Sequence, residues 1–107
     1  MKEPSEIVVF ITTADEQEAK TIANLLLEQK KVACANIVPM VSSIFRWRGK
    51  LESENEGLLI LKTKISLLND VVSMVKSAHS YDAPEIIALP IIGGNPDYLN
   101  WINEETE

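Results

Sequence analysis

Two side chains, His79 and Cys34, are the candidates for binding a soft or borderline metal ion. Each is the only residue of its type in the chain. A neutral imidazole nitrogen binds copper or zinc, whereas a histidine at a helix end can instead bond a carbonyl. Cys34 lies in an apolar stretch, where a thiol is either inert and buried or, if exposed, a ligand for Cu(I). Copies of His79 from other chains, or Asp82 or Glu85 of another chain, would complete a ligand set around His79.

A second group of polar residues is expected near a cleft between subunits: Lys62, Tyr81, Asp82 and Glu85. A carboxylate beside a lysine performs general acid–base chemistry or forms an interfacial ion pair. The chain has no second histidine, no GxSxG and no HExxH pattern. Gly93-Gly94 lacks the flanking sequence of a phosphate-binding loop. We therefore expect no catalytic residues and no enzyme activity.

The segment Arg46–Lys50 is basic and contains Trp47, a pattern that also occurs in nucleic-acid patches. The carboxylates that follow at once, and the acidic total, favour another interpretation. We expect a hairpin tip that docks on a neighbouring subunit, with its basic residues pairing to Glu52, Glu54 and Glu56. The expected interface residues are Phe45, Trp47 and Trp101.

The composition is that of one globular domain spanning residues 1–107, with 46% hydrophobic and 24% charged residues. The net charge of −6 disfavours nucleic acid and anionic membranes as partners. A single cysteine excludes an internal disulfide. The first residues lack the basic flank and apolar core of a signal peptide, and no apolar run is long enough to span a membrane. These features predict a cytoplasmic protein.

Hydrophobic patterning predicts a buried strand and then a helix at the start of the chain. Residues 7–11 are continuously apolar, which is typical of a strand covered on both faces. The sequence from Thr13 to Glu16 has the form of a capping box, so we expect Thr13 to cap the helix. One apolar helical face follows at Ala19, Ile22, Ala23 and Leu26. Lys30 and Lys31 are expected at the helix C-terminus.

A long hairpin is predicted over about residues 34–64, with its tip near 47–52. In residues 43–48 the side chains at odd positions (Ser43, Phe45 and Trp47) alternate with Ile44, Arg46 and Arg48, the two-residue period of a strand. Residues 58–63 form the returning strand. Pro39 marks a bulge or an edge position, since proline donates no ladder hydrogen bond.

The last third of the chain predicts a helix, a strand and a short helix. Ser66 is the expected cap of a helix that ends before Pro84, and residues 85–91 read as the fourth strand. Asn95-Pro96 has the form of a helix start, and residues 104–107 are expected to fray. The buried face of the first of these helices is expected at Leu68, Val71, Val72 and Val75.

The resulting β-α-β-β-α-β order predicts an α+β, ferredoxin-like antiparallel sheet with two helices on one face and a short C-terminal helix. Residues 7–11 and 58–61 are apolar at every position, so both faces of the sheet require burial. Only one face has helices. We therefore expect a homo-oligomer in which a second copy covers the other face.

Over residues 7–102 the chain resembles the CutA family, the divalent-cation tolerance proteins. The segments that carry the resemblance are Phe10–Thr13, Ala33–Pro39, Trp47–Lys50, Leu61–Thr63, His79–Ile86 and Asp97–Trp101. The resemblance implies a homotrimer of ferredoxin-like subunits that is structurally related to the PII signalling proteins.

The resemblance also implies a non-catalytic role in tolerance to divalent metals, copper above all, with a metal ion or small ligand bound at subunit clefts. No cofactor is required for this role. An alternative is a PII-like signalling or scaffold trimer that binds a metabolite or a partner protein. Family copper ligands are a first-strand cysteine and a histidine pair; these positions are Ile11 and Ala78-His79 here.

Overall fold

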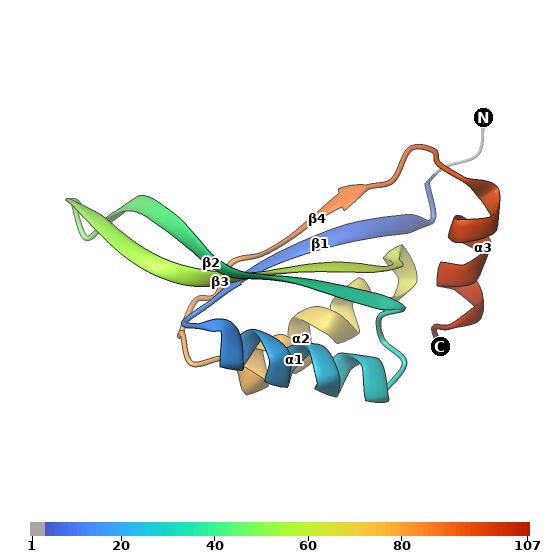
Figure 1. The fold of residues 1–107 in the computed structure, drawn as a ribbon, viewed down its shortest axis with the longest axis horizontal. Helices are drawn as coiled ribbons and strands as arrows, with labels where there is room; N and C mark the ends of the chain where they lie inside the picture. The colour runs from blue at the N-terminus through green and yellow to red at the C-terminus, as the bar shows by residue number, and fades with distance from the viewer. Residues whose placement is uncertain (1–3) are drawn as a thin grey trace.

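The computed structural model describes residues 4–107, which form one four-stranded antiparallel sheet and three α-helices. The strands are β1 (Glu6–Thr13), β2 (Cys34–Trp47), β3 (Lys50–Lys64) and β4 (Ile86–Pro90), in the order β2-β3-β1-β4. The helices α1 (Glu16–Glu28) and α2 (Leu68–Ala78) lie on the same face, and α3 (Pro96–Glu104) lies across one end (Figure 1). The predicted α+β, ferredoxin-like architecture is confirmed.

The core lies between the sheet and the helices α1 and α2. Alternate residues of the two central strands face the helices, so Val9 lies opposite Leu61 and Ile11 opposite Leu59. All four are fully buried. The helices contribute their own buried apolar stripes to the same cluster: Ile22, Ala23, Leu26, Val71 and Val75.

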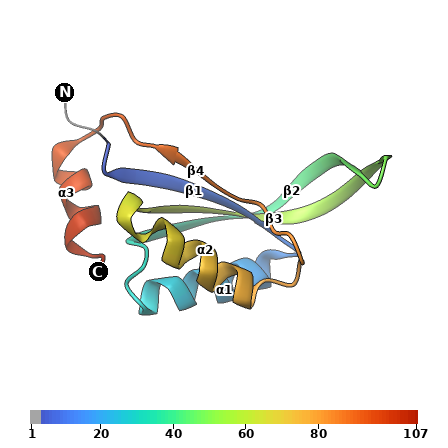
Figure 2. The ribbon, with the colours of Figure 1, turned by 180° about the vertical axis from the view of Figure 1, so that it is seen from behind.

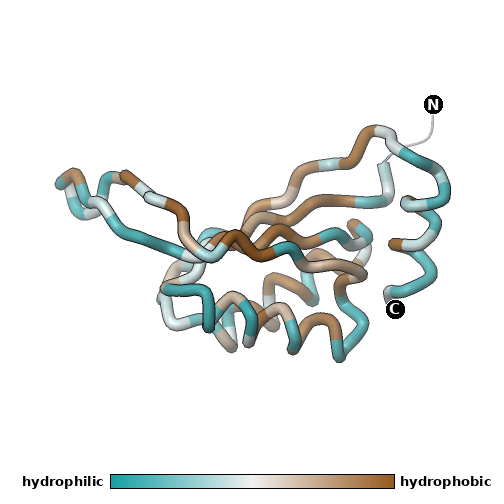
Figure 3. Tube along the Cα trace, in the orientation of Figure 1, coloured by the Kyte–Doolittle hydropathy of each residue, from teal (hydrophilic) through white to brown (hydrophobic). Residues whose placement is uncertain are grey.

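The other face of the sheet is also apolar, but neither α1 nor α2 covers it (Figure 2). This outer face carries Val8 and Phe10 on β1 and their register partners on β3 and β4. On β4, Ile87 and Leu89 are 52% and 51% exposed. The hydropathy trace shows apolar residues along these strands and a hydrophilic β3 arm in the projecting hairpin (Figure 3).

The strands β2 and β3 form a hairpin that projects well past the sheet, in a molecule measuring 44 × 30 × 22 Å. Its two-residue turn is Arg48-Gly49, with φ of 51° and 78°, so both residues take the left-handed conformation that tight hairpins require. The register shifts between Val38 and Val41, around Pro39. The predicted bulge is therefore confirmed, and β2 is also an edge strand.

Two predicted helix caps were wrong. Thr13 ends β1 and is fully buried, and its hydroxyl donates to the carbonyl of Asp15 at 2.7 Å. Asp15 caps α1 instead, because its Oδ1 accepts the Glu18 N–H at 2.8 Å. Ser66 is not a cap either, since it lies inside a 3₁₀ turn (Ile65–Leu67) that precedes α2. The predicted Asn95 cap of α3 is confirmed.

The C-terminal residues were wrongly predicted to fray. Thr106 is buried and its hydroxyl donates to the Ile102 carbonyl at 2.9 Å. The Glu107 N–H donates to the Lys30 carbonyl at 2.9 Å. Lys31 Nζ lies 3.0 Å from carboxylates of both Asp70 and Glu107, so it joins the tail to α2 rather than neutralising the end of α1.

Substituting Gly57 by alanine tests how closely β3 approaches the start of α1. An added Cβ would lie 2.6 Å from Thr13 Oγ1 and 2.7 Å from the Asp15 carbonyl oxygen, so the backbone must shift. We expect Gly57→Ala to reduce the free energy of unfolding by about 1–3 kcal/mol in urea titrations. Gly93→Ala is the control, since nothing lies within 4 Å. Equal destabilisation by both variants would contradict the close approach.

Candidate functional site

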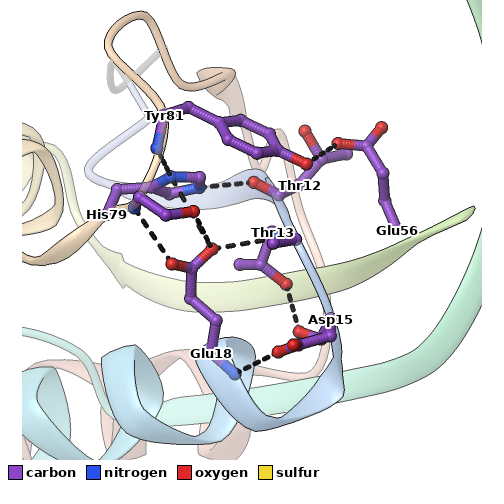
Figure 4. Close-up of polar contacts among 9 residues, drawn as sticks. Thr12, Thr13, Asp15, Glu18, Glu56, His79 and Tyr81 are labelled. Atoms are coloured by element: carbon purple, nitrogen blue, oxygen red, sulfur yellow. Dashed lines mark hydrogen bonds and ion pairs between the residues drawn. The ribbon is translucent and has the colours of Figure 1, made fainter. Parts of the chain in front are cut away.

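His79 is a buried junction between α2, β1 and the segment that follows α2. It is the C-terminal cap of α2, and its side chain is fully buried. Its Nε2 lies 2.7 Å from the Thr12 carbonyl oxygen, and its Nδ1 accepts the Tyr81 N–H at 3.0 Å (Figure 4). The carbonyl requires a proton on Nε2 and the amide requires a lone pair on Nδ1. These contacts assign the neutral Nε2–H tautomer and occupy both ring nitrogens.

Glu18 connects the start of α1 to the same segment (Figure 4). Its carboxylate accepts the Ser80 N–H at 2.9 Å, the Ser80 hydroxyl at 3.1 Å and the Ala14 N–H at 2.9 Å. One oxygen lies 3.7 Å from His79 Nδ1. Burial by itself would raise the pKa of Glu18. The hydrogen bonds from Ala14 and Ser80 outweigh burial and place this pKa below its ordinary value.

Tyr81 extends this network to the hairpin. Its ring lies 4.7 Å from the His79 ring, and its hydroxyl donates to Glu56 at 2.8 Å. Glu56 is only 9% exposed. Burial first, and then the hydrogen bond to and negative charge of Glu56, raise the pKa of the Tyr81 phenol above its usual range. The phenol therefore remains a donor to Glu56 over the physiological range.

Beside Tyr81 lies a cleft of about 630 Å³, which we call the acidic cleft. It separates the hairpin from the segment after α2, and its lining includes three aromatic rings and four carboxylates. The lining residues are Ala14, Phe45, Trp47, Glu52, Glu54, Asn55, Glu56, Tyr81, Asp82 and Ala83. Its volume is in the range of small-molecule sites.

The structure brings together only some of the residues predicted for a cleft. Tyr81 and Asp82 line the acidic cleft, and so do Phe45 and Trp47, which were expected in an interface. Glu85 is exposed and does not line it. The remaining predicted residues lie elsewhere: Lys62 bonds Asn36 on the outer face, and Trp101 stacks on Tyr98 of α3 at 5.4 Å.

The two predicted metal ligands, His79 and Cys34, lie at opposite ends of the sheet. Cys34 pairs with Lys62, which pairs in turn with Val8, whereas His79 contacts Thr12. Cys34 is half-buried outside the core cluster. Burial, and then the proximity of Cys34, raise the pKa of Tyr98. Among residues 4–107, no three His, Cys, Asp or Glu side chains gather as a metal-binding group.

Within residues 4–107 of one copy of the chain, the basic residues of the hairpin tip do not pair with the carboxylates that follow them, so pairing between subunits stays a prediction. Within the described part of the chain, no ion pair joins Arg46, Arg48 or Lys50 to Glu52, Glu54 or Glu56. The Arg48 guanidinium instead lies 5.7 Å from the centre of the Trp47 ring. Both residues are exposed at the tip.

Sequence reasoning missed Glu18, and it named Glu56 only as a partner of the basic hairpin tip, not of Tyr81. The spacing of Asp15 and Glu18 is itself a capping-box pattern, one that the Thr13 assignment obscured. Glu56 carries no local signal, because its partner Tyr81 is 25 residues away.

Comparison with known proteins gives the family. The family model described as CutA1 divalent ion tolerance protein matches residues 7–105. The chain belongs to the CutA1 family. It is 46% identical over 101 residues to the divalent-cation tolerance protein CutA of Thermus thermophilus, covering 94% of this chain and 98% of that protein. It is 45% identical over 100 residues to the chloroplastic CutA of Arabidopsis thaliana, covering 94% of this chain and 55% of that protein.

Solved CutA1 structures share this fold. The rice CutA1 crystal structure has a TM-score of 0.94 at 43% identity, covering 98% of this chain and 96% of that chain. The structure of the Thermus thermophilus protein has a TM-score of 0.93 at 45% identity, and the match covers 95% of this chain and 99% of that chain. The chain spans about half the length of the plant CutA relatives it matches.

Substituting Glu18 by glutamine tests the junction between α1 and the segment after α2. Folding lowers the pKa of Glu18. The stability that Glu18 contributes is therefore complete above its unfolded pKa, near 4.5, and is lost as the pH falls through the lower pKa of the folded state. We expect Glu18→Gln to cost about 1 kcal/mol at neutral pH and to flatten the acid loss of stability, measured by urea titration at several pH values. Glu28→Gln, at an exposed position on the same helix, should neither lower the stability at neutral pH nor flatten its loss in acid. An unchanged acid slope in Glu18→Gln would contradict the assignment.

Proposed function

We propose that the chain is a non-enzymatic homotrimeric protein of divalent-metal tolerance that binds metal ions or a small ligand at clefts between subunits. The observation that carries this proposal is the acidic cleft beside the hairpin, next to an outer sheet face that neither α1 nor α2 covers. The Thermus thermophilus relative is named for divalent-cation tolerance, which supports the biological role.

The outer face and the hairpin support assembly through copies of this chain. Ile87 and Leu89 of β4 are half exposed, and the hairpin presents Phe45 and Trp47 at 37% and 54% exposure. Exposed apolar surface of this extent is typical of an interface. A trimer packed on the outer faces would place each hairpin against a neighbour, so that the acidic cleft lies at a subunit boundary.

For the metal ion, the carboxylates of the cleft suit hard divalent cations. The residues of one protomer do not fit a copper site made of His79 and Cys34, because the two are far apart and His79 has both nitrogens bonded. Direct copper binding therefore requires ligands from more than one subunit or the release of a His79 hydrogen bond.

The alternative is a PII-like signalling or scaffold trimer in which the cleft binds a metabolite or partner protein and the metal response is indirect. The aromatic walls formed by Phe45, Trp47 and Tyr81 favour this alternative, since bare metal ions gain little from apolar surface.

A cytoplasmic location remains a prediction. No helix in residues 4–107 is long and apolar enough to cross a membrane. Relatives are named as chloroplastic, and a solved relative from Archaeoglobus fulgidus is titled periplasmic.

Truncating Trp47 tests the assembly. We expect Trp47→Ala to weaken the trimer by about 3–5 kcal/mol if the ring is buried against a neighbour, measured as dissociation on dilution in native mass spectrometry. Phe45→Ala should act in the same direction. Leu27→Ala, on α1 and away from the outer face, should leave the mass distribution unchanged. Fully trimeric Trp47→Ala and Phe45→Ala at micromolar concentration would refute hairpin docking.

Copper addition tests direct metal binding. Native mass spectrometry with one equivalent of copper per subunit should show a trimer carrying integral copper. Where ligands from another subunit join His79 or Cys34, the variant at that residue, His79→Ala or Cys34→Ser, should reduce the bound copper. A trimer that stays copper-free would refute direct copper binding and leave the signalling alternative. Retained copper in both variants would place the site on other residues, such as the cleft carboxylates.

A further inference from the structure

We infer that residues 95–107, which we call the α3 lid, close over Cys34 and open about a hinge at Gly93-Gly94, and that Lys31 holds the lid closed. This motion involves neither the acidic cleft nor its ligand. Three features of the structure carry it: a hinge that is free of packing, a single apolar anchor and an ionic closure at the end of the lid that is remote from the hinge.

The hinge lies between β4 and α3, in a segment that has no regular structure. Gly93 and Gly94 are both exposed. A Cβ added at Gly93 would have no neighbour within 4 Å, and the nearest neighbour of one at Gly94 would be Leu99 of the lid itself, at 3.8 Å. Two adjacent glycines without packing leave the backbone free to rotate. On the sheet side, the Ile91 N–H donates to the Glu6 carbonyl at 3.0 Å, so the motion begins after Ile91.

Within one subunit, the lid is attached to the sheet by little apolar burial. Ile102 is the one residue of α3 that is fully buried. The attachments around it are polar: Asn103 Nδ2 donates to the Glu6 carboxylate at 2.9 Å, and Lys64 Nζ donates to the Asn103 carbonyl at 3.4 Å. An element with few buried apolar contacts opens at a smaller free-energy cost than the core does.

Lys31 closes the lid at the end remote from the hinge. Its Nζ lies 3.0 Å from a carboxylate oxygen of Asp70 on α2 and 3.0 Å from one of Glu107 in the lid. The Lys31 side chain is only 14% exposed, and the Glu107 N–H adds a hydrogen bond to the Lys30 carbonyl at 2.9 Å. Because α1 and α2 lie on the face opposite the outer face, subunits that pack on the outer face do not cover this closure (Figure 1).

The lid places an aromatic pair beside Cys34. The rings of Tyr98 and Trp101 lie 5.4 Å apart. Burial first, and then the neighbouring Cys34 thiol, raise the pKa of the Tyr98 phenol, so this side chain lies against the thiol. Cys34 is half-buried in this arrangement. Moving α3 away from the sheet removes Tyr98 and leaves the thiol more exposed, so Lys31 controls access to the single cysteine of the chain.

Hydrogen–deuterium exchange on the protein in its native assembly tests the lid. We expect Lys31→Ala to speed amide exchange in residues 99–107 about tenfold, because the closed state loses two charge-assisted contacts, and to leave exchange in β1 unchanged. Glu107→Gln removes only the carboxylate of the lid and should speed exchange of the same amides about threefold. Lys20→Ala removes an exposed ion pair with Glu16 inside α1 and is the matched control.

Alkylation of Cys34 with iodoacetamide tests what the lid covers. We expect the alkylation rate to rise in Lys31→Ala and in Glu107→Gln, in the same order as amide exchange of the lid. Raising the salt concentration should increase the wild-type rate, because salt screens the attraction between Lys31 and its carboxylates. Lys20→Ala should be alkylated at the wild-type rate.

Three results would overturn the inference. Unchanged exchange in residues 99–107 of both variants would mean that Lys31 does not hold the lid or that a neighbouring subunit clamps α3. Faster exchange of β1 in step with residues 99–107 would mean that the variants unfold the whole subunit instead of opening the lid. Faster exchange of residues 99–107 with unchanged alkylation would mean that the lid does not cover Cys34.

Discussion

The two central strands carry apolar side chains on both faces, and this constraint governs the rest of the molecule. The helix-facing set, typified by Val9 and Leu61, builds the core with α1 and α2. Neither α1 nor α2 covers the opposite set. A sheet of this kind is complete only when something else packs on its second face, and the projecting hairpin lies beside that same uncovered surface. The candidate site forms where the hairpin leaves the sheet.

A polar network then holds the site in place without using any hairpin backbone. His79 bonds the end of β1 and the Tyr81 amide, while Glu18 bonds the start of α1 and Ser80. The segment that lines the cleft is therefore fixed by buried hydrogen bonds, whose loss leaves unsatisfied polar groups. Such a segment presents Tyr81 and Asp82 in one arrangement, which reduces the ordering that a ligand must impose.

The fold was largely predictable because its signals are local. The apolar run of β1, the stripe of α1 and the Asn95-Pro96 start of α3 each lie within a short window. The errors arose where a tertiary contact overrode a local pattern. Thr13 is drawn into the core instead of capping a helix, and Glu107 is held by Lys31. Of the site, Tyr81 and Asp82 were among the polar residues predicted near a cleft, whereas the contact of Glu56 with Tyr81 joins distant segments and leaves no pattern in either.

The bulge around Pro39 acts as a phase shift in the hairpin. Before it, Val38 shares the outer face with Leu58; after it, Val41 shares that face with Glu56, so β2 has advanced three residues while β3 advanced two. This single extra residue is what turns Phe45 and Trp47 toward the carboxylates of β3. Without the extra residue in β2, Ile44 and Arg46 would occupy the positions that Phe45 and Trp47 take on this face. Arg46 would then lie on the face that carries the glutamates, and its positive charge would offset part of theirs.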